Sequence, residues 1–308
     1  MNNFFRFLSF SFITLLITSC SKSDDPFVPI PLRDYKEQFI TDSTAIDTYF
    51  KTHRMVVSAD GKFDVSFVAE TNVAQSMRTL PHAYLRDTTI KEDEIEYKFY
   101  FIKFAEGTQR RPTQVDSVYV NYRGTLLTDA STEFDNSVNP VWFKLQEVIS
   151  GWEHIFPNFK TGTYASSPPN GPIYSNFGAG VVFLPSGLAY YEGGSNIIPS
   201  YTPIAFSFKL MELRYRDHDR DGILSKDERT FGTLLPTKRW TVNPLDIDTD
   251  SDGVPDMNDV DDDGDDILTR IEIINSVTGL PYAFSAIPAC PADTVDPTKK
   301  VHLSKSCK

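Results

Sequence analysis

The sequence is poor in cysteine, in long apolar runs and in clustered basic residues, and each scarcity argues against a class of protein. Its 308 residues include three cysteines, Cys20, Cys290 and Cys307. Beyond the N-terminus, no apolar run reaches the roughly 18 residues of a membrane-spanning helix. Lysine and arginine total 30, against 42 aspartates and glutamates. Because phosphate contacts need clustered basic side chains, the composition argues against nucleic acid as the main partner.

The negative charge is confined to one part of the chain. Residues 217–272 contain 17 acidic and 6 basic residues, a net charge of −11, whereas the rest of the chain carries only −1. Such a concentration of carboxylates points to cations as ligands. Hydrophobic residues make up 40% of the chain and aromatic residues 13%, enough for packed cores. The length allows two or three domains.

The N-terminus indicates export. Residues 1–19 hold a single charge, Arg6, followed by about a dozen apolar residues, which is typical of a signal peptide. The sequence Ile17-Thr18-Ser19-Cys20 resembles the lipobox of bacterial lipoproteins, which implies lipidation at Cys20. Residues 20–31 are then a tether, and its acidic start resembles the surface-export signals of Bacteroidetes lipoproteins. The alternative is an ordinary signal peptide with a cysteine nearby.

Two cysteines remain after lipidation, and both lie in the predicted C-terminal tail, residues 276–308. In an oxidising cell envelope Cys290 and Cys307 are expected to form a disulfide. Two free thiols are the alternative.

The pattern of apolar residues predicts an α+β fold. Residues 32–92 form a small extension, with a helix over residues 41–53 capped by Ser43 or Thr44 and presenting Ile46, Tyr49 and Phe50 on one face. Strands are predicted over residues 97–104, 117–122 and 204–210, and a short helix over 148–159. Four or five antiparallel strands around one helix would form this domain, residues 93–214.

Five short motifs in this domain occur in the order of a known family. They are Val118–Gly124, Glu133–Ser137, Phe143–Trp152, Leu184–Tyr190, and Ile197–Pro199 leading to Phe206. Together they resemble the FKBP-type peptidyl-prolyl cis-trans isomerases over roughly residues 95–214. The resemblance implies an antiparallel sheet wrapped around a short helix, and an activity that needs no cofactor.

The resemblance also implies the site. Trp152 would form the floor of an aromatic pocket, with Ile198 on a flanking loop; the walls would be Tyr122, Phe134, Phe143, Val148, Ile149 and Phe206. Tyr190 and the backbone N–H of Ile149 would donate hydrogen bonds to the substrate, and Asp135 would lie at the rim near the Tyr122 hydroxyl. The alternative is that the aromatic residues only form a core. The chain departs from the family at Tyr191, where glycine is common, and in a longer segment over residues 163–182.

The acidic block contains three loops with calcium-ligand spacing, in a predicted module of residues 215–275. The first matches an EF-hand loop, the second resembles a thrombospondin type 3 repeat, and the third is again EF-hand-like, with Asp266 in the place of the turn glycine. Their expected ligands are Asp217, Asp219, Asp221, Ile223, Ser225 and Glu228; Asp248, Asp250, Asp252, Val254, Asp256 and Asp259; and Asp261, Asp263, Asp265, Ile267 and Glu272. Oxygen ligands favour Ca²⁺, up to three ions with a structural role. A solvated acidic linker is the alternative.

These observations predict a lipid-anchored protein of the cell envelope, on the periplasmic face of the outer membrane or on the cell surface. It would isomerise X–Pro bonds in exported proteins. The main alternative is a non-catalytic lipoprotein that holds an envelope or surface partner through the same pocket. A structural part in a motility or secretion machine is a third hypothesis, which rests on family analogy alone.

Overall fold

The computed structural model describes residues 32–59, 62–81, 85–92, 94–127, 132–166, 171–195, 197–228, 245 and 247–307. The predicted signal peptide, the tether and Cys20 lie outside these residues. Residues 33–308 cluster into one compact unit. Within the described part of the chain, no helix combines the length and apolarity needed to cross a membrane.

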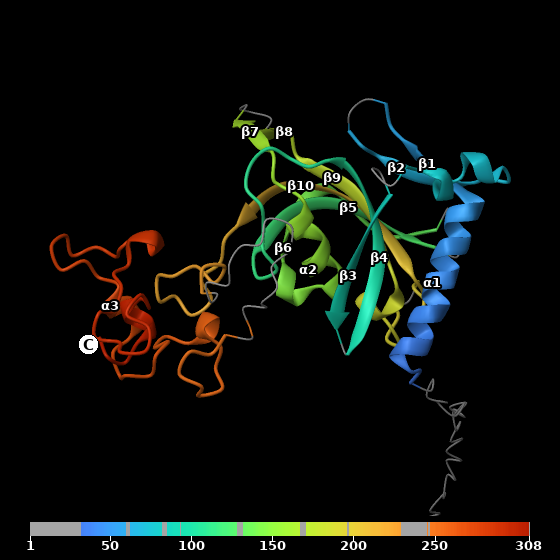
Figure 1. The fold of residues 1–308 in the computed structure, drawn as a ribbon. Helices are drawn as coiled ribbons and strands as arrows, with labels where there is room; N and C mark the ends of the chain where they lie inside the picture. Colours follow the sequence, from blue (N-terminus) through green and yellow to red (C-terminus); the bar gives the residue numbers. More distant parts are fainter. Residues whose placement is uncertain are drawn as a thin grey trace, which may run out of the picture. The chain divides into compact units, whose positions relative to one another are not determined.

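A six-stranded antiparallel sheet is the centre of the fold (Figure 1). Its strand order is β3-β4-β9-β10-β5-β6. The strands are β3 (Leu85–Glu92), β4 (Ile95–Ala105), β9 (Gly178–Leu184), β10 (Ile204–Arg214), β5 (Ser117–Leu126) and β6 (Glu133–Lys144). Strand β6 lies at an edge, where the missing N–H of Pro140 is tolerated. The α+β fold class follows the prediction, with one strand more than expected.

Both faces of this sheet are buried, because alternate residues of each strand point to opposite sides. In β4, Tyr97 and Phe99 join the core that contains Trp152, whereas Ile102 joins a second core on the other face. Strand β9 is buried at every position, as expected for a strand covered on both sides. Phe183 of this strand packs in the second core. The sheet is therefore a layer between two cores and not an open shell around one helix.

The first core is closed by α2 (Ser150–Ile155) and the second by α1 (Tyr35–Thr52), so the two helices lie on opposite faces (Figure 1). Helix α1 begins earlier than predicted, because the side chain of Asp34 caps it by accepting from Glu37 N at 3.0 Å. Ile46 and Phe50 are buried as predicted. A hairpin of β1 (His53–Val57) and β2 (Val65–Ala69) follows and contributes to the second core.

The predicted boundary between an extension and the main domain at residue 92 falls inside a hairpin. Strand β3 pairs with β4 from Leu85↔Ile102 to Glu92↔Ile95, so the two segments share one sheet. Because α1 also covers that sheet, the extension is part of the same domain.

The remaining short elements are β7 (Thr163–Ser166), β8 (Pro172–Ser175), α3 (Thr269–Glu272) and 3-10 turns at Val73–Gln75, Met77–Thr79, Leu145–Glu147, Phe156–Asn158, Ser186–Leu188, Asp256–Asn258, Phe284–Ala286 and Val301–Leu303.

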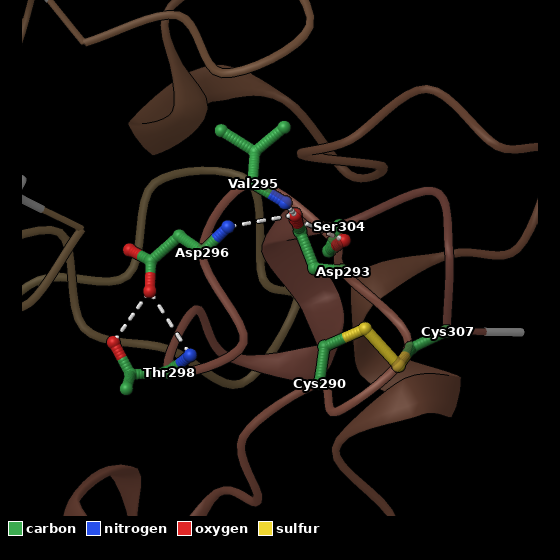
Figure 2. Close-up of a disulfide and its surroundings, with 7 residues drawn as sticks. All are labelled: Cys290, Asp293, Val295, Asp296, Thr298, Ser304 and Cys307. Atoms are coloured by element: carbon green, nitrogen blue, oxygen red, sulfur yellow. Dashed lines mark hydrogen bonds between the residues drawn. A yellow bond between two sulfur atoms is a disulfide. The ribbon is translucent and has the colours of Figure 1, made fainter.

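The C-terminal segment has a small core and a disulfide. Ile223, Ile273 and Ile287 form a buried cluster that joins the acidic loops to the tail, so the predicted boundary at residue 275 divides one packed unit. Cys290 and Cys307 are disulfide-bonded, with Cα atoms 5.7 Å apart (Figure 2). Figure 2 also shows two carboxylates that hold the turn between the cysteines. Asp293 accepts hydrogen bonds from Val295 N, Asp296 N and Ser304 Oγ, and Asp296 accepts from Thr298.

Candidate functional sites

An aromatic cavity of about 670 Å³ opens between α2, β5, β6 and the loop after β9. Trp152, only 4% exposed, forms its floor at the start of α2. The rings of Tyr122, Phe143 and Phe206 lie 5.1–5.2 Å from the Trp152 ring, with interplanar angles of 80–85°. These edge-to-face contacts fix each ring against its neighbours. These contacts hold the four rings against one another, and the cavity lining also contains polar side chains, including Glu92, Glu147 and Ser150.

Gly124 allows two of these rings to approach the sheet. A Cβ atom at this position would lie 2.4 Å from the Phe134 ring and 2.9 Å from the Phe206 ring. Phe134 packs against Phe206 at 5.4 Å and against Tyr190 at 6.4 Å. It supports the wall from behind, because it does not belong to the residues that line the cavity. The strand glycine is thus needed for the packing of the pocket wall.

Two tyrosines and one aspartate contribute polar groups to the cavity. The Tyr122 hydroxyl donates to Asp135 at 2.7 Å, the pairing that the sequence predicts. Burial and the hydrogen bond to Asp135 raise the pKa of Tyr122 above its ordinary value. Burial and the same carboxylate raise the pKa of Tyr190. Both phenols therefore stay protonated at neutral pH: Tyr122 uses its hydrogen for Asp135, and Tyr190 can donate to a ligand.

Three further predicted residues line the cavity and one does not. Val148, Ile149 and Tyr190 are in the lining, and Ile149 is the N-cap residue of α2. The N–H of an N-cap residue takes no part in the hydrogen bonds of its helix, so this donor is free for a ligand. Ile198 is 3% exposed and belongs to the core below the site.

Several lining residues were not predicted. They are Tyr35, Glu92, Glu147, Ser150, Gly187, Leu188 and Ala189. The most unexpected is Tyr35, because it belongs to α1, a helix that the sequence places in a separate extension. No local signal could identify it, because its approach to the cavity depends on the packing of α1 against the sheet.

A buried carboxylate holds α1 against the loop of the site. Asp42, 1% exposed, accepts hydrogen bonds from Ser186 N at 2.7 Å and Ser186 Oγ at 2.6 Å. Its other oxygen accepts from Gln38 at 2.7 Å. Burial raises the pKa of Asp42, and the hydrogen bonds from Ser186 and Gln38 oppose that shift. Ser186 begins the turn that carries Gly187, Leu188 and Tyr190, so Asp42 fixes one wall of the cavity.

Tyr191, which stands where the family often has glycine, also contributes to the contact between α1 and the site. Tyr191 stacks on Tyr35 with ring centroids 4.2 Å apart and an interplanar angle of 9°, and its hydroxyl donates to the Arg33 carbonyl. Tyr191 has a left-handed backbone (φ +42°), which explains why glycine suits this position where no helix covers it. The larger side chain joins α1 to the rim of the site.

The longer segment over residues 163–182 does not reshape the cavity. Its described residues form the β7–β8 hairpin and the start of β9, and none of them lines the cavity. Tyr174 of the hairpin lies 5.9 Å from Tyr119 of β5, which in turn stacks on Trp142. The insertion therefore packs against the outer part of β5 and β6.

The three acidic loops repeat one hydrogen-bond pattern. In each loop the first aspartate accepts from the N–H groups of the fourth and sixth residues: Asp217 from Arg220 and Gly222, Asp248 from Ser251 and Gly253, and Asp261 from Gly264 and Asp266. Each of these donor residues has a left-handed backbone. Asp266 adopts φ +74°, so aspartate takes the place of the turn glycine without a change of loop shape. The shared spacing of residues therefore gives all three loops the same backbone conformation.

The loops gather carboxylates, although not all of the predicted ones. Asp248, Asp250 and Asp252 form one cluster of mutually close oxygens, and Asp261, Asp263 and Asp265 form another. The third contains Asp219, Asp221 and Glu228 of the first loop together with Asp262, which the sequence did not indicate. Ile223, Val254 and Ile267, predicted to offer carbonyls, each follow a left-handed residue, and each N–H is bonded to an aspartate of its own loop.

Other predicted ligands have structural roles in these loops. Asp217 is not in the carboxylate cluster of its loop. Ser225 and Asp256 close their loops, because the side chain of each accepts from the N–H of the second loop residue, His218 or Thr249. Asp259 accepts from Asp261 N at 2.9 Å. Each of these oxygens accepts a hydrogen bond from the backbone of its loop, and the prediction that these residues bind a cation stays a prediction.

Several carboxylates in these clusters are buried without a hydrogen bond. Among the described residues, neither oxygen of Asp263, which is 1% exposed, has a hydrogen-bond partner, and neither has either oxygen of the half-buried Glu272 beside the third cluster. Burial and repulsion by Asp263, Asp265 and Asp261 raise the pKa of Glu272 to about 8. Within the described part of the chain, no loop lies between two α-helices, so the helix–loop–helix form of an EF-hand is not seen. The donors fit a hard divalent cation such as Ca²⁺, which prefers carboxylate and carbonyl oxygens.

Comparison with known proteins places the aromatic cavity in a family. A sequence model of the FKBP-type peptidyl-prolyl cis-trans isomerases matches residues 108–166, which include Tyr122, Asp135 and Trp152. The chain contains an FKBP-type domain. FkpA isomerases of Aeromonas hydrophila and Escherichia coli K12 are 36% and 32% identical to this chain over 119 and 111 residues. These alignments cover 38% and 35% of this chain and the same shares of the relatives. The chain thus spans just over a third of their length.

Among solved structures, the crystal structure of FkpA from Escherichia coli has a TM-score of 0.32 and 27% identity, covering 41% of this chain and 51% of that one. A second family model, described as BamM C-terminal, matches residues 218–297. This match runs from the first acidic loop into the tail. It therefore agrees with the hydrophobic cluster that joins those two segments.

Proposed function

We propose that the protein is a peptidyl-prolyl cis-trans isomerase of the bacterial cell envelope. The observation that carries this proposal is the aromatic cavity above Trp152, whose lining also contains Tyr190 and Ile149 as candidate hydrogen-bond donors. The FKBP-type domain supports the reaction class.

The reaction needs little more than such a cavity. Rotation about an amide bond costs about 18–20 kcal/mol because the twist removes its resonance. The X–Pro isomers themselves differ by only about 0.5–1 kcal/mol. Water stabilises the planar, charge-separated amide, so transfer of the bond into an apolar cavity favours the twisted state relative to the planar one. Catalysis then consists of tighter binding of the twisted amide.

The rim would hold the substrate while the bond turns. The proline ring would rest against Trp152, and Tyr190 and the Ile149 N–H would donate to carbonyls on either side of it. Asp135 accepts from Tyr122 and so fixes the direction of that hydroxyl. Tyr35 adds a wall on the α1 side, where the residue before proline would be contacted by apolar and aromatic surface.

Measurement of isomerisation on a peptide with an apolar residue before proline tests the proposal. Tyr190→Phe removes one hydrogen bond to the substrate and is expected to lower kcat/KM about tenfold, for a bond of about 1.4 kcal/mol. Tyr164→Phe, on the exposed strand β7, is the matched control and should leave kcat/KM unchanged. If the unmodified protein does not accelerate isomerisation, the proposal that it is an isomerase is wrong.

The rival function is a binding module that uses the same cavity without turnover. It predicts that proline-containing peptides bind, that the Tyr190→Phe variant binds them more weakly, and that neither protein accelerates isomerisation. The contact of Tyr35 of α1 with the cavity is compatible with both functions. The assay above therefore separates them.

The envelope location rests on the sequence of residues 1–31, with lipidation at Cys20. The disulfide between Cys290 and Cys307 supports an oxidising compartment. Exported proteins with exposed X–Pro segments would be the substrates. Metabolic labelling with a fatty acid, compared between the native chain and Cys20→Ala, tests the anchor: only the native chain should be labelled.

We further propose that the acidic loops bind Ca²⁺ for structural purposes. Buried carboxylates without partners, such as Asp263 and Glu272, are strongly unfavourable unless a cation lies between them. Removal of Ca²⁺ with a chelator should lower the melting temperature of residues 217–307 and expose them to proteases. A chain whose stability is the same with and without Ca²⁺ would contradict this role.

A further inference from the structure

We propose that Asp262 of the third acidic loop is a ligand of the cation held by the first loop, so that one ion joins the two loops. The inference rests on the proposed calcium binding, and it adds a ligand that the loop spacing does not contain. The ligand would be a hard divalent cation of the calcium type, because every donor in the cluster is a carboxylate oxygen.

The composition of the three clusters differs. In the second and third loops the cluster consists of the first, third and fifth residues of that loop. In the first loop the third and fifth residues, Asp219 and Asp221, are joined by Glu228 and by Asp262. One oxygen from each of these four residues lies within 4.8 Å of the others. Asp262 thus takes the place that Asp217 would have in the pattern of its neighbours.

The burial of Asp262 points to a missing ligand. Its side chain is 1% exposed, and neither oxygen has a hydrogen-bond partner within the described part of the chain. Among the described residues, His302 Nε2 lies 4.0 Å from Asp262 Oδ2, which is beyond hydrogen-bond distance, and burial lowers the pKa of His302, so the contact is not a charged pair at neutral pH. Glu228 is 7% exposed, and burial together with repulsion by Asp219, Asp221 and Asp262 raises its pKa. Unpaired carboxylates so placed repel one another strongly unless a cation lies among them.

The backbone of the loop explains why Asp262 turns away from its own cluster. In all three loops the N–H of the second residue donates to the side chain of the ninth, as from Asp262 to Thr269 Oγ1 at 3.1 Å. The second residue of the first loop, His218, also bonds its ninth residue through the side chain, and so does Thr249. Asp262 makes no such side-chain bond, and its carboxylate is directed to the first loop.

Calcium titration calorimetry on the full-length chain tests the inference with matched variants. Asp262→Asn should weaken one class of site at least tenfold and leave the remaining sites unchanged. Asp266→Asn is the control, because Asp266 is exposed in the same loop and asparagine also tolerates its left-handed backbone. Binding by the control should equal that of the native chain.

A double-mutant cycle decides whether Asp262 and the first loop share an ion. Asp221→Asn and Asp262→Asn should affect the same site, so the double variant should lose less than the product of the two separate losses. Asp221→Asn with Asp263→Asn should affect two sites independently. If the native chain binds Ca²⁺ but Asp262→Asn binds as the native chain does, the shared site is wrong and the calcium proposal stands. If the native chain binds no Ca²⁺, both are wrong.

Discussion

Removal of the Asp42 carboxylate should destabilise the protein and weaken the isomerase site together. Asp42 accepts two hydrogen bonds from Ser186, whose side chain is fully buried. Asp42→Ala would leave a buried N–H and a buried hydroxyl without an acceptor. Hydrogen bonds to a charged group contribute about 1.5–3 kcal/mol each, so the free energy of unfolding should fall by about 3–5 kcal/mol.

In a domain of this size that loss should lower the melting temperature by about 6–20 °C. Asp47→Ala on the same helix is the matched control. Asp47 is partly exposed and forms ion pairs with Lys51 and Arg78, which contribute about 0–1 kcal/mol. Because Asp42 also fixes the turn that carries Tyr190, its replacement should raise KM for the peptide. Equal melting temperatures for the two variants, with unchanged KM, would refute the role given to Asp42.

Three further predictions concern other parts of the chain. Burial, and then repulsion by Glu92, raises the pKa of Glu153 to about 7. Ionisation of this group therefore lowers the free energy of unfolding as the pH rises from about 4.5 to 7. Glu153→Gln should raise the melting temperature at pH 8 and not at pH 4. Replacement of both Cys290 and Cys307 by serine opens a loop of 17 residues and should cost the tail about 3 kcal/mol, seen as earlier chemical unfolding of that segment only. Trp152→Leu should lower kcat/KM without abolishing folding, and a variant with native kcat/KM would contradict the role of the floor.

The aromatic site was largely predictable, because its residues occur in a fixed order of local motifs. Tyr122, Phe143, Trp152 and Phe206 meet as expected. The helix start was not predictable from caps alone. Ser43 and Thr44, expected as caps, lie inside α1 and donate to carbonyls four residues earlier.

Contacts between distant segments account for what the sequence did not reveal. Tyr35 reaches the cavity only because α1 packs on the sheet, and Asp262 reaches the first loop only through the folding of the acidic block. The calcium-loop spacing predicted where the carboxylates lie, but not that Ser225 and Asp256 would close their loops. A hydrogen bond to the backbone competes with a metal for the same oxygen, and spacing does not distinguish the two.

The packing of α1 also determines which contacts a force applied to the N-terminal segment would reach first. The helix starts within four residues of the proposed tether. Arg33, just before the helix, lies over the Tyr201 ring at 4.3 Å, and Tyr35, its first residue, lines the cavity and stacks on Tyr191. Any pull on the chain ahead of residue 32 therefore reaches the domain first at the wall of the cavity, before it reaches the sheet. If the proposed lipid anchor holds the chain to a membrane, tension would act on the contact between Tyr35 and Tyr191 before it acts on the strands of the sheet.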